Sequence, residues 1–143
     1  MRTLFDTSVL VAALVDQLGN HEAAFRAFHR FTSGEHSGCC STHAVAECYA
    51  TLTALPVATR ISPDEARILI EETVLARLTP LASAPDDYRD VLRAVAGLGL
   101  RSGAVYDALH AHCARKAGVD QILTYNLSDF ARFDLGGIAV EAP

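Results

Sequence analysis

Three acidic residues stand alone in apolar stretches of the 143-residue sequence. Asp6 is the only formal charge from Thr3 to Val15, and Glu47 is the only permanently charged residue from Thr42 to Leu55. Asp107 stands in a third such stretch, close to the start of an expected helix. Burying an unpaired carboxylate costs on the order of several kcal/mol. Each acid therefore needs a proton, a hydrogen-bond donor or a cation, and a metal-binding or acid–base site would supply one.

Each acid also has a purely structural explanation. Asp6 could cap the N-terminus of the helix that follows it. Glu47 has no ion-pair partner in its own helix and could lie on a solvent-facing stripe with His43 and Thr51. Asp107 could be stabilised by the free amides and dipole of its own first helical turn. Taken one at a time, the three positions do not decide between structure and chemistry.

A fourth polar cluster, Thr124-Tyr-Asn-Leu-Ser-Asp-Phe130, follows an expected strand. Its Asn126 and Asp129 would lie in a loop at the carboxyl end of that strand, with Phe130 and Leu127 anchoring the loop in the core. The alternative is turn chemistry or helix capping, which Asn, Ser and Asp commonly provide.

Strand-like and helix-like segments alternate along the chain, without repeats or linkers. This alternation predicts a three-layer α/β/α domain over residues 1–143, with a central, mostly parallel sheet of about five short strands. The expected strands are residues 3–5, 39–41, 77–82, 121–124 and 138–140, and the expected helices are residues 8–14, 21–31, 42–55, 62–76, 85–97 and 105–117.

In a parallel sheet, strand ends and the adjacent helix starts converge on one rim, which is where such folds bind ligands. Carboxylates that meet there without a nearby Lys or Arg would repel one another. Hard divalent cations with oxygen ligands remove that repulsion, and Mg²⁺ or Mn²⁺ held by a few carboxylates is the usual arrangement for phosphoryl chemistry. The sequence therefore predicts a divalent metal site at this rim.

The net charge of −5, from 12 basic and 17 acidic residues, argues against a general nucleic-acid coat protein. It does not exclude an enzyme that meets phosphate through a metal ion. Four cations flank the later motifs and could hold an RNA backbone, although solvated surface is the alternative for each: Arg101, Arg115, Lys116 and Arg132.

The four cysteines show no paired spacing and are expected to be small buried hydrophobic residues. No apolar run is long enough for a membrane span, and Asp6 interrupts a would-be signal peptide, so the cytoplasm is the expected location.

The motifs together resemble those of the PIN-domain ribonucleases, and most closely the VapC toxins of toxin–antitoxin pairs. They are Asp6-Thr-Ser8 after an apolar strand, Ala-Val-Ala-Glu47, Tyr106-Asp107-Ala-Leu109, and the stretch from Thr124 to Phe130, in that order. The resemblance implies a Mg²⁺- or Mn²⁺-dependent endoribonuclease that attacks tRNA or rRNA, is inhibited by a small antitoxin protein and is commonly a homodimer. It assigns the core acids to Asp6, Glu47 and Asp107, and the hydroxyls that orient them to Thr7, Ser8 and Thr124.

The sequence departs from the family pattern at one position. Many PIN domains carry a fourth acid where this chain has Asn126, and Asp129, three residues further on, is expected to replace it. Asp6 and Asp107 are then the better direct metal ligands, and Glu47 or Asp129 the general base or water-orienting group.

Two other classes of protein also fit part of the pattern. A phosphatase or receiver-like domain places an aspartate after its first strand, but Ser8 occupies the position where the former needs a second aspartate. A receiver needs a lysine late in the sheet, whereas the single lysine, Lys116, falls in an expected helix. A non-catalytic α/β binding module with structural carboxylates is the remaining alternative.

Overall fold

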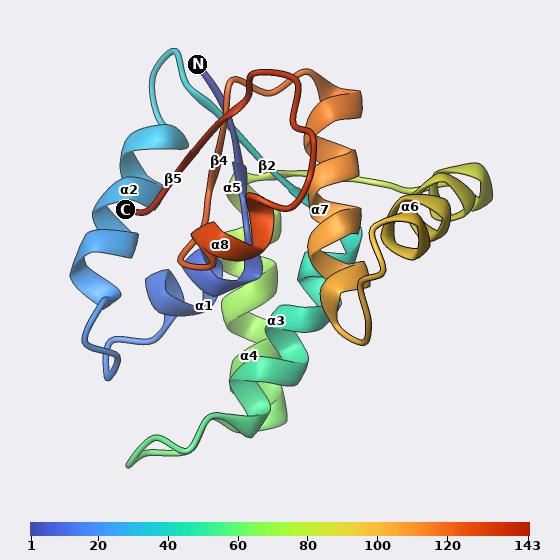
Figure 1. The fold of residues 1–143 in the computed structure, drawn as a ribbon. Coiled ribbons are helices and arrows are strands. Elements are labelled where there is room, and N and C mark those ends of the chain that lie inside the picture. The colour runs from blue at the N-terminus through green and yellow to red at the C-terminus, as the bar shows by residue number, and fades with distance from the viewer.

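The computed structural model describes all 143 residues and has five parallel strands at its centre. The strand order is β3-β2-β1-β4-β5, so the N-terminal strand lies in the middle of the sheet (Figure 1). The predicted α/β class and parallel sheet are confirmed. The strands are β1 (Arg2–Phe5), β2 (Ser37–Ser41), β3 (Thr79–Leu81), β4 (Gln121–Leu123) and β5 (Ala139–Glu141).

Helices cover both faces of this sheet, as the alternation predicts (Figure 1). They are α1 (Thr7–Leu14), α2 (His21–Phe31), α3 (Thr42–Ala54), α4 (Pro63–Leu69), the π-helical turn η1 (Ile70–Val74), α5 (Leu75–Arg77), α6 (Pro85–Gly97), α7 (Ala104–Ala117) and α8 (Leu127–Phe130).

Alternation along β1 divides the core between the two faces, because successive strand side chains point to opposite sides. Phe5 packs with α1, α2, α3 and α4, in a cluster that includes Leu10 and Phe28. Leu4 packs on the other side with Ile122, Phe130 and the inner face of α7. The sheet is therefore sandwiched between a layer of α1–α5 and a layer of α7 and α8, with α6 packed on α7.

Local signals in the sequence place several helix ends. Ser62 and Glu65 form a capping box at the start of α4, with Pro63 in the first turn. Gly118 ends α7 in the left-handed conformation at φ 60°, which costs glycine no steric strain. Pro80 lies on the edge strand β3, where its missing N–H is tolerated.

Two features differ from the sequence-based expectation. The predicted helix over residues 62–76 contains the π turn η1, so it is not one continuous α-helix. The polar loop after β4 contains the short helix α8, whose four residues are too few to show a helical period. All four cysteines are buried and free, as predicted. No helix is long and apolar enough to cross a membrane.

Candidate active site

Asp6 lies where β1 ends and α1 begins, and only 2% of its surface is exposed. Its carboxylate does not cap α1, which excludes the capping explanation. Instead, the hydroxyls of Ser8 and Thr124 donate to Oδ2 of Asp6 at 2.7 and 2.8 Å. The predicted convergence of the first strand end and the Thr124 loop is confirmed, because β1 and β4 pair side by side.

The direction of these two hydrogen bonds follows from their other partners. The Ser8 hydroxyl accepts the backbone N–H of Tyr125 at 3.0 Å, and the Thr124 hydroxyl accepts that of Asn126 at 2.9 Å. Each hydroxyl therefore has its proton free for Asp6. The result is a carboxylate fixed by Oδ2, as hydroxyls orient a metal ligand.

The hydroxyl of Thr7 was expected to orient an active-site acid, but it makes no such contact. Its hydroxyl is buried but has no hydrogen-bond partner, so it does not hold the Asp6 carboxylate in this structure. Of the three hydroxyls expected to orient the acids, those of Ser8 and Thr124 contact Asp6 and that of Thr7 does not.

Glu47 faces the same rim from α3 and contacts two histidines. Nε2 of His110, on α7, lies 2.9 Å from Glu47 Oε1 and 3.8 Å from Asp6 Oδ1. His43 Nε2 lies 3.2 Å from the same Glu47 oxygen without the geometry of a hydrogen bond. Within α3 the only side chain near the Glu47 carboxylate is therefore His43, one turn before it, and the hydrogen-bonded partner of Glu47 comes from α7.

His110 links three elements through its imidazole, which is 1% exposed. Its Nδ1 lies 2.8 Å from the hydroxyl of Ser41, and that hydroxyl also accepts the Ala44 N–H at 3.0 Å as the N-cap of α3. Because the Glu47 carboxylate can only accept, Nε2 carries the proton that is directed at it. His110 thus fixes the Glu47 carboxylate beside Asp6.

Asp107 lies in the first turn of α7, and its carboxyl group has a pKa raised to about 6. Burial is the main cause, and repulsion from Asp6 and Asp129 adds to it, whereas His110 and Arg132 lower the pKa. The charges of Asp6 and Asp129 therefore both oppose ionisation of the Asp107 carboxyl group.

Arg132 contradicts the expectation that the acids meet without a nearby Lys or Arg. Its Nη2 lies 3.6 Å from Asp107 Oδ2 and 3.5 Å from Asp129 Oδ1. Both distances are those of loose ion pairs, and all three side chains keep contact with solvent. One guanidinium therefore compensates part of the acidic charge from the solvent side.

Asp129 lies within α8, and its side chain is 44% exposed and caps nothing. Phe130 is fully buried, so its expected role as an anchor for this segment is confirmed. Leu127 is 44% exposed, so the expectation that it provides a second anchor in the core is wrong. Asn126 occupies the N-cap position of α8 without a side-chain capping bond.

The four cations with an expected RNA contact occupy two regions. Arg132 lies beside the acids, and the exposed Arg101 precedes α7 by three residues. Arg115 and Lys116 lie in the last turn of α7, at the other end of the helix from Asp107. Lys116 binds Asp87 at 2.9 Å, so a structural partner already holds it.

The raised pKa of Asp107 gives a stability prediction for the metal-free protein. Between about pH 4 and 6 the folded state binds more protons than the unfolded state, so wild-type stability falls as pH rises through this window. Asp107→Asn removes this cost, which we expect to be about 3 kcal/mol above pH 7 and absent near pH 4. Urea unfolding in EDTA at several pH values measures it, and a variant less stable than wild type at pH 8 would contradict it.

The donor set at this rim fits a hard divalent cation. It consists of carboxylate oxygens, one of them on the buried Asp6, with repulsion among Asp6, Asp107 and Asp129 that a cation would relieve. The structure has no group of three His, Cys, Asp or Glu side chains positioned to hold one ion together. Mg²⁺ commonly keeps several waters and binds through one or two carboxylates, so such a closed set is not required.

The fold is that of a PIN domain. Residues 3–135 match the PIN domain family, and the chain belongs to that family. Ribonuclease VapC40 of Mycobacterium tuberculosis (strain ATCC 25618 / H37Rv) is 33% identical over 136 residues, which cover 95% of both sequences.

Solved structures with the same fold include two from toxin–antitoxin systems. VapC20 of Mycobacterium tuberculosis, described as a sarcin–ricin loop cleaving toxin, aligns with a TM-score of 0.74 over 93% of this chain and 97% of its own. VapBC2 of Rickettsia felis, bound to a DNA fragment from its promoter, aligns with a TM-score of 0.68 over 99% and 98%. Both are 16% identical to this chain, so they establish the shared fold.

Proposed function

We propose that this protein is a Mg²⁺- or Mn²⁺-dependent endoribonuclease and the toxin of a VapBC-type toxin–antitoxin pair, acting through one nuclease domain. The observation that carries the proposal is the buried Asp6 carboxylate, oriented by two hydroxyls and placed beside Glu47 and Asp107. Its relationship to a VapC ribonuclease along almost the whole chain supports the same activity.

Asp6 and Asp107 would hold the cation. Ser8 and Thr124 keep the Asp6 carboxylate in one orientation, which leaves Oδ1 free of hydroxyl donors. The bound cation would polarise the RNA phosphate and lower the pKa of a bound water. Asn126 serves the site through its backbone, because its N–H fixes the Thr124 hydroxyl.

Glu47 and Asp129 are the candidates for accepting a proton from the attacking water. His110 Nε2 donates a hydrogen bond to Glu47 Oε1 and so sets the position of this carboxylate. Glu47 can then act as a water-orienting group or as a metal ligand. Asp129 is more exposed and has no short hydrogen bond to its carboxylate, so it is freer to take up the proton.

The partners of the proposed enzyme follow from its relatives. Structural neighbours include VapBC complexes, which supports a small antitoxin as the inhibitor of this chain. We further propose tRNA or rRNA as substrate, a homodimer as the active form, and the cytoplasm as the location. Purification together with the product of an adjacent small reading frame, followed by mass measurement of the complex, tests the antitoxin and the stoichiometry.

A nuclease assay tests the activity. We expect the purified protein to cleave single-stranded RNA with Mn²⁺ or Mg²⁺ and to leave it intact in EDTA. The reason is that the site consists of carboxylates, which repel the RNA phosphate unless a cation is bound between them. The products should carry a 5′-phosphate, read by ligation-dependent sequencing. Cleavage that is equally fast in EDTA would contradict the metal dependence, and no cleavage of any RNA with either metal would favour the binding-module alternative.

A further inference from the structure

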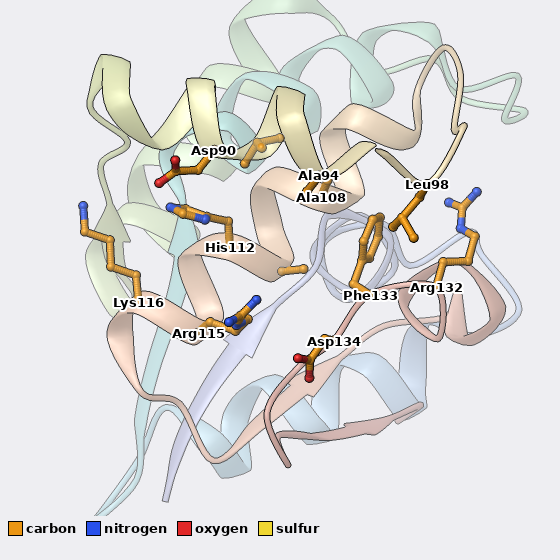
Figure 2. A pocket seen from close by; sticks show the side chains of 12 residues that line it. Asp90, Ala94, Leu98, Ala108, His112, Arg115, Lys116, Arg132, Phe133 and Asp134 are labelled. Atoms are coloured by element: carbon orange, nitrogen blue, oxygen red, sulfur yellow. The ribbon is translucent and has the colours of Figure 1, made fainter. Parts of the chain in front are cut away.

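A second feature lies next to the acidic rim, and the catalytic residues do not account for it. A cavity of about 780 Å³ opens between α6, α7 and the segment after α8 (Figure 2). Figure 2 shows His112, Arg115 and Lys116 along α7, with Arg132 and Phe133 on the facing segment. Three of the four cations with an expected RNA contact therefore share one cavity.

The cavity is continuous with the acidic rim through two elements. Arg132 lines the cavity and also lies 3.6 Å from Asp107. On α7, Ala108, Ala111 and Arg115 line it at helical spacing, directly after Asp107. Arg115 lies about 12 Å along the helix axis from Asp107, roughly the rise of three or four stacked nucleotides.

Arg115 is the cation of this cavity that remains available to a ligand. Lys116 and His112 both bind Asp87, at 2.9 and 2.8 Å, and these contacts lower the pKa of the Asp87 carboxyl well below its usual range. Arg115 is exposed and has no carboxylate within ion-pair distance. The lining also carries Asp90 and Asp134, and Arg132 is paired with Asp107 and Asp129, so a phosphate contact would centre on Arg115.

Phe133 adds an aromatic surface to these cations. Its ring is partly buried against the core, and the guanidinium carbon of Arg132 lies 5.7 Å from the ring centroid. Single-stranded nucleic acids bind where a cationic groove follows the backbone and aromatic side chains stack on the bases. The cavity has this composition, with Arg132 and Phe133 beside Asp107 and Arg115 further along α7.

We propose that this cavity binds the single-stranded RNA flanking the scissile phosphate, with Arg115 on a backbone phosphate and Phe133 stacked on one base. The inference rests on the proposed ribonuclease function and extends it to a substrate-binding groove. The groove binds RNA without requiring the metal, so binding and cleavage can be measured separately.

Fluorescence anisotropy with a labelled, mixed-sequence 12-nucleotide RNA in EDTA tests the groove. We expect Arg115→Ala to weaken binding and to flatten the dependence of log Kd on log salt concentration by about 0.7, the loss of one phosphate contact. Phe133→Leu should weaken binding about fivefold or more with an unchanged salt slope, because it removes stacking but no charge. Arg60→Ala is the matched control, since Arg60 is an exposed arginine outside this cavity and should bind RNA as wild type does.

The results separate this inference from the proposed function. Arg115→Ala and Phe133→Leu variants that bind RNA as Arg60→Ala does would overturn the groove, whether or not the protein cleaves RNA. If these variants instead change the sedimentation coefficient with RNA binding unaltered, the cavity is a protein interface and the inference is wrong. RNA binding that depends on Arg115 in a protein without nuclease activity would retain the groove and overturn the proposed function. Thermal unfolding of Phe133→Leu verifies that the variant is folded, and Arg115 is exposed enough to be replaced without loss of packing.

Discussion

Asp6→Asn and Asp107→Asn should each reduce RNA cleavage to background while the protein remains folded. The two acids approach the same rim from β1 and α7, and the charge of Asp6 helps to raise the pKa of Asp107. Replacing either carboxylate by an amide keeps the size of the side chain but removes the negative charge that a divalent cation needs. Cleavage of a labelled RNA in Mn²⁺ gives the activity, and circular dichroism gives the fold.

The fold should tolerate Asp6→Asn because the side chains that hydrogen-bond to Oδ2 of Asp6 are hydroxyls. Ser8 and Thr124 can turn their protons to suit an amide, although each already accepts one backbone N–H. Asp16→Asn provides the matched control, since Asp16 is an exposed aspartate outside the acidic rim and this variant should cleave as wild type does. If either active-site variant cleaves at a rate near that of wild type, that residue is not a metal ligand.

The parallel sheet explains why much of this site could be predicted from sequence. Asp6 and Thr124 each follow an apolar run, and pairing of β1 with β4 brings the two strand ends together. Asp107 falls in the first turn of its helix, as expected, because Ser102-Gly103 and Gly118 mark the two ends of that helix. Short-range signals of this kind are sufficient when the topology is regular.

His110 shows what the sequence did not reveal. It stands three residues after Asp107, so the two lie on one face of α7, and this spacing was the available signal. Whether that face meets solvent, β2 or α3 depends on how α7 packs, and only the structure places His110 between Ser41 and Glu47. The partnership of Glu47 with His110 joins residues 63 positions apart, which no local pattern encodes.

Arg132 was missed as a neighbour of the acids for a different reason. It stands three residues after Asp129, a spacing that brings side chains together only if the backbone is helical. The helix α8 has four residues and begins in a stretch rich in turn-forming side chains, so a loop was the reasonable expectation. A predicted loop gives no fixed geometry between Asp129 and Arg132, so the ion pair between them could not be inferred from the sequence.

A substitution at the fourth acidic position is the second change that we expect to have a large effect on RNA cleavage. Asp129→Asn should lower RNA cleavage by roughly a hundredfold or more, the loss typical of a general base or of a group that orients a metal ligand. Asp129 helps to raise the pKa of Asp107, so its charge reaches this proposed metal ligand. Asn126 can offer a carbonyl oxygen but cannot accept a proton at neutral pH, so it cannot replace Asp129 in that role.

Asn126→Asp is the complementary change. It should retain activity and tighten Mn²⁺ binding, because it adds a carboxylate two residues after Thr124, whose hydroxyl the backbone N–H of residue 126 holds in place. Cleavage rates across a Mn²⁺ titration, together with calorimetric Mn²⁺ binding to the RNA-free protein, separate a change in metal affinity from a change in the chemical step.

Arg132 complicates the comparison, because Asp129→Asn also removes one of its ion-pair partners. Arg132→Ala removes the same ion pair but keeps the Asp129 carboxylate. If Asp129 acts only by holding Arg132, both variants should lose the same amount of cleavage activity at saturating RNA. We expect the maximal rate to fall much further in Asp129→Asn than in Arg132→Ala. If Asp129→Asn cleaves like wild type while Asn126→Ala is inactive, the asparagine side chain fills the fourth position and Asp129 is a surface residue that Arg132 merely contacts.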